Sequence, residues 1–195
     1  MESPDFRFLI IKRNEMVYEH IFRQWRITLS RIFAAVLTVL VLTSTSKWED
    51  IGIISTVFFL TGAVLVGIAT VGRLWCSLYI SGYKSNTLVT TGPYSVCRNP
   101  LYFFSLLGGV GVGLATETLT IPLLILIGFA IYYPYVIKRE HKRLMDIHAE
   151  QYQQYCDKTP CFIPSFSLFY EPDKYVIRPK IFRKIFSTHY VSFGF

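Results

Sequence analysis

The sequence has little charge and lacks the residue patterns that hold small secreted or metal-binding domains together. Only 17% of its 195 residues are charged, whereas a soluble domain usually carries about a quarter. The four cysteines form no CxxC pair and no histidines stand at zinc-ligand spacing, so reduced thiols and no metal site are expected. With 52% apolar residues and a mean hydropathy of +0.38, the composition is typical of an integral membrane protein.

The N-terminus also lacks the features of a cleaved signal peptide. Its short apolar patch forms no uninterrupted hydrophobic region, and no small-residue cleavage site follows. The net charge of +7 fits either nucleic acid or an anionic membrane surface as a partner. The apolar composition favours the membrane, and no nucleic acid is expected. At this length we expect a single domain over residues 1–195.

Charge-free stretches mark the expected membrane spans, since a charge at the bilayer centre costs roughly 2.5–3.5 kcal/mol. They cover residues 32–46, 51–72, 99–116 and 118–137. A further apolar piece, 74–83, is too short to cross, and it either lengthens the second helix or lies along the interface. Because few residues separate the last two stretches, we expect a tight antiparallel hairpin, with Pro122 in the first turn of the fourth helix.

The basic residues predict the orientation. Of the 20, only Lys47 lies in the loops on the opposite side from the rest, so the positive-inside rule places both termini in the cytoplasm. The membrane is then a bacterial inner membrane, or the endoplasmic reticulum if the chain is eukaryotic. After the fourth span we expect a cytoplasmic amphipathic helix over 135–157, ended by Pro160 and Pro164, and then a basic, aromatic tail that suits the interface.

The predicted fold class is therefore all-α integral membrane, with four transmembrane helices and a cytoplasmic amphipathic helix. The apolar run 190–195 is either a docked tail or the start of a fifth, truncated membrane helix. Within the third span, Gly109, Gly111 and Gly113 either allow close helix packing or contact a cofactor. Glu117 is interpreted as a solvated charge at a loop tip.

Two segments on the cytoplasmic side carry candidate chemistry. In the first, residues 88–102, Gly92-Pro93 and Asn99-Pro100 are turn signals that place Arg98 at a helix N-terminus near the membrane face. An arginine beside free backbone N–H groups makes an anion site, while the alternative is an arginine that only anchors the loop. In the second segment, the run 139–143 is by composition a solvated charge cluster.

Together the two segments resemble the isoprenylcysteine carboxyl methyltransferase family and its phospholipid methyltransferase relatives. The first family motif has the form L-V-x-x-G-x-Y-x-x-x-R-H-P-x-Y-x-G, which is matched by Leu88, Val89, Gly92, Tyr94, Arg98, Pro100 and Tyr102. Asn99 replaces the histidine and Phe104 the last glycine. The second motif is matched by Glu140, Tyr152, Tyr155 and Phe162-Ile163-Pro164. His141 stands where that motif has a second glutamate.

The resemblance implies S-adenosyl-L-methionine as the methyl donor and a lipid or lipid-modified acceptor that enters from the bilayer. It implies these cofactor-binding residues: Leu88, Val89, Tyr94, Arg98, Asn99, Tyr102, Glu140 and His141. Arg139 and Glu140 would be catalytic, with Arg139 orienting an anionic acceptor, and no metal is needed. The first 86 residues would supply membrane helices, residues 87–164 the cofactor-binding part and residues 165–195 the interfacial tail.

The implied roles follow from charge. Arg98 and Asn99 would hold the methionyl carboxylate, and Glu140 would accept hydrogen bonds from the ammonium group or the ribose hydroxyls. Tyr94 and Tyr102 would pack on the adenine or, by cation–π attraction, on the sulfonium.

The alternative is a non-catalytic membrane protein that binds a lipid or a partner on the same scaffold. Two departures from the family pattern support it, because Asn99 cannot act as a general base and His141 reverses or removes the charge of a binding glutamate. The acceptor group stays open among a carboxylate, an amine and a phosphate, and the sequence gives no oligomeric state.

Overall fold

The computed structural model describes residues 52–81 and 87–175, which belong to one compact unit spanning 45–189. The first expected span and the apolar run 190–195 lie outside the described residues. The described part of the chain consists of helices and loops and contains no strand. Its elements are α2 (Gly52–Ile80), α3 (Pro93–Val96), α4 (Pro100–Leu114), α5 (Thr120–Lys158) and the short 3-10 helix η1 (Phe166–Leu168).

Helix α2 is longer than the span expected at 51–72. Its 29 residues correspond to about 43 Å, and they include most of the apolar piece 74–83. That piece therefore lengthens the second helix, which is one of the two arrangements expected from the sequence. Arg73 is the only charged residue in α2, and the other residues of this helix are apolar, small or hydroxylated.

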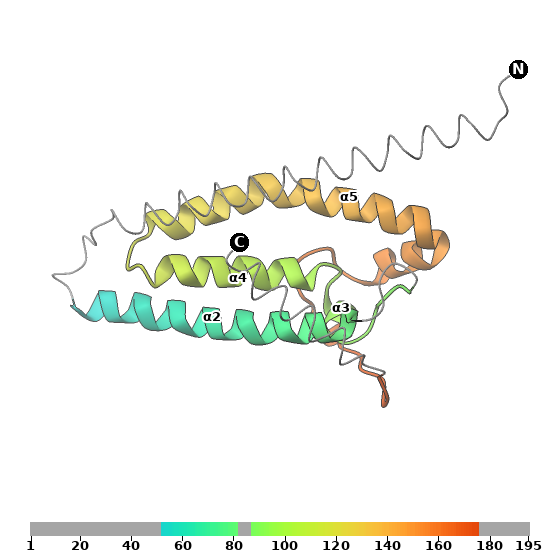
Figure 1. Cartoon of the computed structure of the whole chain (residues 1–195), viewed down its shortest axis with the longest axis horizontal. Helices are drawn as coiled ribbons and strands as arrows, with labels where there is room; N and C mark the ends of the chain where they lie inside the picture. The colour runs from blue at the N-terminus through green and yellow to red at the C-terminus, as the bar shows by residue number, and fades with distance from the viewer. Residues whose placement is uncertain (1–51, 82–86, 176–195) are drawn as a thin grey trace, which may run out of the picture. The chain divides into compact units, whose positions relative to one another are not determined.

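Helices α4 and α5 form the expected antiparallel hairpin, and α4 lies between α2 and α5 (Figure 1). Glycines set the spacing of these layers. A Cβ on Gly62 would lie 2.5 Å from the carbonyl oxygen of Gly111, and a Cβ on Gly113 would lie 2.8 Å from the backbone nitrogen of Pro122. The expected close packing at Gly111 and Gly113 is therefore observed, with Gly111 facing α2 and Gly113 facing α5.

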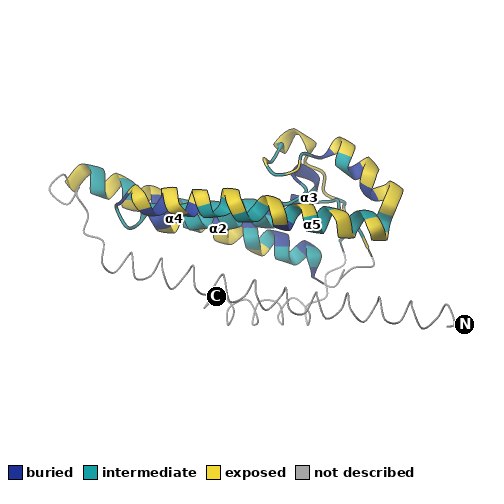
Figure 2. Cartoon of the chain, turned by 90° about the horizontal axis from the view of Figure 1, so that it is seen from above, coloured by how far each residue is buried: buried dark blue, intermediate teal, exposed yellow. Residues whose placement is uncertain are grey.

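Many positions along α2 and α5 are exposed (Figure 2), and large apolar side chains occupy many of them. Both helices are long and apolar enough to cross a membrane, yet only 11% and 22% of their most apolar windows are buried. A core helix of a soluble protein would be mostly buried, whereas these faces suit lipid. Helix α4, with 15 residues and a length of about 22 Å, is shorter than a full crossing.

The amphipathic segment expected at 135–157 is not a separate helix. Its first part continues the fourth apolar stretch within α5, and a kink at Ala149, where φ is 36° and ψ is −109°, joins it to a second helical stretch that ends at Lys158, before Pro160. An alanine at positive φ marks local backbone strain. The bend reverses the chain (Figure 1), so that the Tyr152 ring returns to within 5.3 Å of the His141 ring.

The hairpin tip also corrects an expectation. Glu117, which was expected to be a solvated charge, is only half-exposed and accepts a hydrogen bond from the Ser55 hydroxyl of α2. Its φ is 58°, so the loop turns the carboxylate back onto the neighbouring helix. Because the loop tip lies beside α2, the Glu117 carboxylate has a hydrogen-bond partner that the sequence pattern did not indicate.

Candidate functional site

The segment that follows α5, residues 159–175, is here called the strap. It forms hydrogen bonds with the loop that contains α3. The Gly92 N–H donates to the Tyr170 carbonyl at 2.8 Å, and the Ser165 N–H donates to the Val96 carbonyl at 2.9 Å. The Cys97 thiol reaches the Phe162 carbonyl at 3.2 Å. The two family-like motifs, far apart in sequence, therefore form one layer at the end of the bundle where α2 ends and α4 begins.

Arg98 is held at the centre of this layer. Its backbone N–H donates to the Pro160 carbonyl at 2.9 Å, and its side-chain Nε is buried without a hydrogen-bond partner in the described residues. Burial acts to lower the pKa of the guanidinium, but Cys156, Cys161 and Tyr152 nearby outweigh it and leave the pKa raised. The site thus presents a permanent cation with a buried donor that no described residue uses.

Two tyrosine side chains lie near Arg98. Tyr152 and Tyr155 of the returning helix are both buried, and the Tyr155 hydroxyl donates to the Tyr94 carbonyl at 2.6 Å. Burial, with Cys76 and Tyr155 close by, raises the pKa of the Tyr94 phenol well above its ordinary value. These phenols stay neutral at physiological pH, so the cation of Arg98 faces no opposing anion from them.

Asn99 and His141, the two departures from the family pattern, have different surroundings. The Asn99 amide donates to the Cys161 carbonyl at 2.9 Å and does not cap α4. The His141 ring packs against Tyr152, and its Nδ1 lies 3.9 Å from the Cys156 sulfur. Asn99 therefore ties the loop to the strap, while His141 lies with the tyrosines around Arg98.

The remaining predicted residues lie at different distances from this centre. Tyr102, in the first turn of α4, packs edge-on against Tyr133 with ring centroids 5.0 Å apart. Glu140 pairs with Arg143 at 3.8 Å on a partly exposed face of α5. Leu88 and Val89 are half-buried in the loop that enters α3. Tyr94, Arg98, Asn99 and His141 are thus each in contact with the returning helix or with the segment after it, whereas Glu140 forms its ion pair with Arg143.

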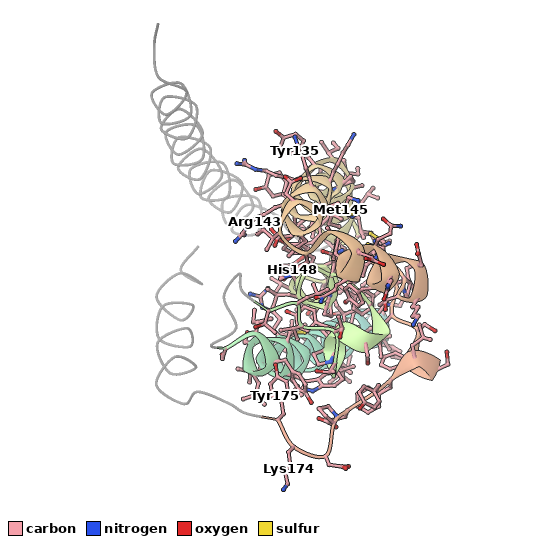
Figure 3. All side chains as sticks on the ribbon, turned by 90° about the vertical axis from the view of Figure 1, so that its right-hand side faces the viewer. Tyr135, Arg143, Met145, His148, Lys174 and Tyr175 are labelled. Carbon is pink, nitrogen blue, oxygen red and sulfur yellow. The ribbon has the colours of Figure 1, made fainter. Side chains whose placement is uncertain are left out.

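An open groove of about 510 Å³ runs beside α5. It is lined by Tyr135, Lys138, Arg139, His141, Lys142, Met145 and Asp146. Figure 3 looks onto this end of the described bundle, with Met145 and Arg143 on α5 and Tyr175 beside α2. His141 lines the groove, and its ring also packs against Tyr152 of the returning helix. The predicted residue Arg139 lines the same groove, so the groove and the tyrosines near Arg98 are connected through His141.

The sequence patterns did not single out Cys156 and Cys161, which lie close to Arg98 and to Asn99 respectively. Tyr152 and Tyr155 were noted only as motif matches, although a spacing of three on a helix places both on one face. That shared face was the available signal for their role. No comparable signal marks the cysteines, since their proximity arises from the bend at Ala149 and the strap.

Comparison with known proteins bears on the family of the chain. The sequence model of the phospholipid methyltransferase family matches residues 25–151. The chain is 41% identical over 159 residues to the nickel-cobalt-cadmium resistance protein NccN of Alcaligenes xylosoxydans xylosoxydans, covering 82% of this chain and 74% of the relative.

It is also 39% identical over 160 residues to the cobalt-zinc-cadmium resistance protein CzcN of Cupriavidus metallidurans, covering 82% and 71%. No solved structure matches. With the family match over most of the chain and both motifs in one layer, the chain belongs to the phospholipid methyltransferase family.

Proposed function

We propose that this protein transfers a methyl group from S-adenosyl-L-methionine to a lipid-linked acceptor at the cytoplasmic face of its membrane. The observation that carries the proposal is the buried Nε of Arg98, which has no hydrogen-bond partner among the described residues and lies just before α4. A guanidinium held in this way is suited to a carboxylate, and the donor's methionyl group supplies one. The family to which the chain belongs gives the reaction type.

The donor supplies an electrophilic methyl group on a sulfonium, and transfer needs alignment and exclusion of water more than acid–base groups. The S–CH₃ bond breaks as the acceptor's lone pair forms the new bond, and the sulfur leaves as a neutral thioether. Arg98 would fix the carboxylate, and the tyrosines Tyr94 and Tyr102 would line the sulfonium side. Asn99 would act by holding the loop to the strap, because its amide donor is engaged by Cys161.

Glu140 is proposed to accept from the donor's ammonium or ribose hydroxyls. Its pair with Arg143 at 3.8 Å is partly exposed, and such pairs contribute little stability. The carboxylate can therefore exchange this partner for the donor at small cost. Arg139, which lines the adjoining groove, is proposed to orient an anionic acceptor.

The test is donor binding by the purified protein in nanodiscs, followed by calorimetry. We expect saturable binding, weakened in Arg98→Ala by about 1.5–3 kcal/mol, the range for hydrogen bonds to charged groups. Lys174→Ala removes an exposed cation outside the α5 groove and is the matched control. Transfer of a labelled methyl group into the lipid fraction of a membrane extract then demonstrates catalysis.

A second candidate is a non-catalytic membrane protein of a metal-resistance system. The names of these two relatives favour it, since they concern resistance to nickel, cobalt, zinc and cadmium. Among the described residues, no three His, Cys, Asp or Glu side chains are grouped as metal ligands. A wild-type protein that binds no S-adenosyl-L-methionine would establish this candidate over the first.

The cytoplasmic orientation is part of the proposal. It rests on the asymmetry of basic residues. A Cys161→Ser background removes an exposed native thiol, and Leu119→Cys and Lys142→Cys then report opposite ends of α5. An impermeant maleimide added from outside should label position 119 alone. Labelling at 142 from that side would reverse the topology.

A further inference from the structure

Arg73 is the one charge carried by α2, and it points toward the neighbouring helices. The residue before it, Gly72, packs so closely on α4 that a Cβ there would lie 2.3 Å from the Phe104 ring. A charged side chain in an apolar helix is expensive, and it usually faces the bundle interior and marks a ligand path. This position therefore calls for a function other than solvation.

The Arg73 guanidinium meets groups from two other helices. Its Nη1 donates to the Ser105 hydroxyl of α4, and that hydroxyl donates in turn to the Leu101 carbonyl at 2.7 Å. The Tyr133 phenol of α5 lies within electrostatic reach of Arg73 and within hydrogen-bonding reach of Ser105. Arg73, Ser105 and Tyr133, here called the Arg73 cluster, thus combine a cation with two hydroxyls.

The cluster is connected to the proposed donor site by tyrosines. Tyr133 packs edge-on against Tyr102 at 5.0 Å, and Tyr102 lies within electrostatic reach of Tyr94. The Tyr94 carbonyl accepts from Tyr155, which lies beside Arg98. A line of phenol groups therefore runs from the motif layer into the bundle and ends at Arg73.

The hydrogen-bond donors of the Arg73 cluster indicate which class of ligand it can bind. A guanidinium has five donors in a planar fork that matches a phosphate or carboxylate, and hydroxyls add single hydrogen bonds to the same anion. A headgroup without an anionic oxygen gains nothing from the fork. The cluster lies on helices whose exposed side chains are largely apolar, which suits a ligand with hydrocarbon chains.

We propose that the Arg73 cluster binds the phosphate or carboxylate of an anionic acceptor lipid. This assignment rests on the proposed methyltransferase function, because it names the acceptor class for the same site. The anion would be anchored at Arg73, with the acceptor's reacting group along the tyrosine line toward Tyr94. Donor binding and anchoring of the acceptor are then carried by two different arginines, Arg98 and Arg73, while Arg139 orients the acceptor from the groove.

The test uses lipids of matched acyl chains in a neutral detergent. Binding of labelled dioleoyl phosphatidic acid, oleate and neutral dioleoylglycerol to the wild type is measured together with binding of inorganic phosphate. We expect at least tenfold preference for one or both anionic lipids over dioleoylglycerol. Preference for phosphatidic acid identifies a phosphate ligand and preference for oleate a carboxylate. Inorganic phosphate binding as tightly as the lipids overturns the lipid assignment.

Three variants locate the site. Arg73→Gln should reduce anionic-lipid affinity at least tenfold, while Lys174→Gln, which removes an exposed cation away from the α5 groove, should leave it unchanged. Arg73→Lys keeps the charge but not the fork, so it should fold normally and still bind severalfold more weakly. Equal lipid affinity in wild type and Arg73→Lys, with equal thermal stability, overturns the proposal.

The affinity for S-adenosyl-L-methionine distinguishes a failure of the Arg73 site from a failure of the proposed methyltransferase function. It should be unchanged in Arg73→Lys, because Arg98 and not Arg73 is assigned to the donor. Normal donor binding without any preference for anionic lipid refutes the Arg73 site alone. Selective lipid binding by a wild type that binds no donor refutes the methyltransferase function and leaves an anionic-lipid site.

Discussion

Asn99 and Cys161 lie 62 positions apart, and a 2.9 Å hydrogen bond joins the side-chain amide of one to the backbone carbonyl of the other. This bond connects the start of α4 to the segment that follows α5. It also explains how asparagine can replace the family's histidine, since either side chain can donate one N–H to a carbonyl. The loop geometry around Arg98 therefore depends on a donor at position 99.

Asn99→Asp should loosen this connection. A carboxylate cannot donate and would face the Cys161 carbonyl, so we expect a loss of about 0.5–1.5 kcal/mol in stability, as for an ordinary exposed hydrogen bond, and weaker donor binding. Asn99→His restores a ring N–H and should retain most of both. Thermal unfolding and calorimetry on the two variants measure the effect. Asp and His variants that behave alike would show that the bond does not hold the loop.

Glu140→Gln should weaken S-adenosyl-L-methionine binding about tenfold, because charged hydrogen bonds are worth roughly twice neutral ones. The comparison is Glu150→Gln, an exposed glutamate on the same helix, for which ordinary surface behaviour predicts a change within about 0.5 kcal/mol. Calorimetry on both variants measures their affinity for S-adenosyl-L-methionine and tests whether Glu140 binds it. If Glu140→Gln matches Glu150→Gln, then Glu140 belongs only to its surface pair with Arg143.

Gly62→Ala should destabilise the bundle, since the new Cβ would lie 2.5 Å from the Gly111 backbone and overpacking typically costs about 1–3 kcal/mol. Gly67→Ala is a stringent control on the same helix, because nothing lies within 4 Å of its Cβ position. Alanine there should be neutral or stabilise the helix by up to about 1 kcal/mol. Thermal unfolding in detergent measures both. Equal melting temperatures would show that α2 and α4 are not in close contact there.

Stability should fall at alkaline pH through Cys97. Burial raises the pKa of this thiol to about 11, whereas an unfolded cysteine has a pKa of about 8.5. The stabilising contribution is complete below the unfolded pKa and is lost as the pH rises through the folded pKa, amounting to up to about 3 kcal/mol. Cys97→Ser keeps a donor toward the Phe162 carbonyl but does not titrate in this range. The difference between wild type and Cys97→Ser in unfolding between pH 8 and 11 isolates the effect, and a constant difference would contradict it.

The strap should touch lipid at Phe166. This side chain is 70% exposed, and the nearby Phe169 packs on Trp75 of α2 at 5.8 Å, beside the exposed apolar face of that helix. Aromatic residues at such a level favour the membrane interface. A photoreactive benzoyl-phenylalanine at position 166 should capture lipid in vesicles, whereas the same group at the exposed, charged Lys174 should capture far less. Equal capture at both sites would place the strap in water.

The sequence by itself determined the helical class, the apolar stretches at 51–72, 99–116 and 118–137, and the family. Span patterns work because charge is excluded from lipid over whole helices, so the signal extends over many residues. The α4–α5 hairpin was equally predictable, since its connection is too short for any other arrangement. The motif spacing around Arg98 was specific enough to indicate the family before any packing was known.

Only the tertiary structure decided which residues surround Arg98. The bend at Ala149 returns Tyr152 to His141, and the strap brings Cys161 to Asn99. Neither contact follows from local spacing, because both depend on how a single backbone reversal and a set of long-range hydrogen bonds fold the chain back. Glu117 and Arg73 show the same principle, since a charge acquires its partner from whichever helix packs beside it, and helix packing is set by glycines and side-chain shape distributed over the whole bundle.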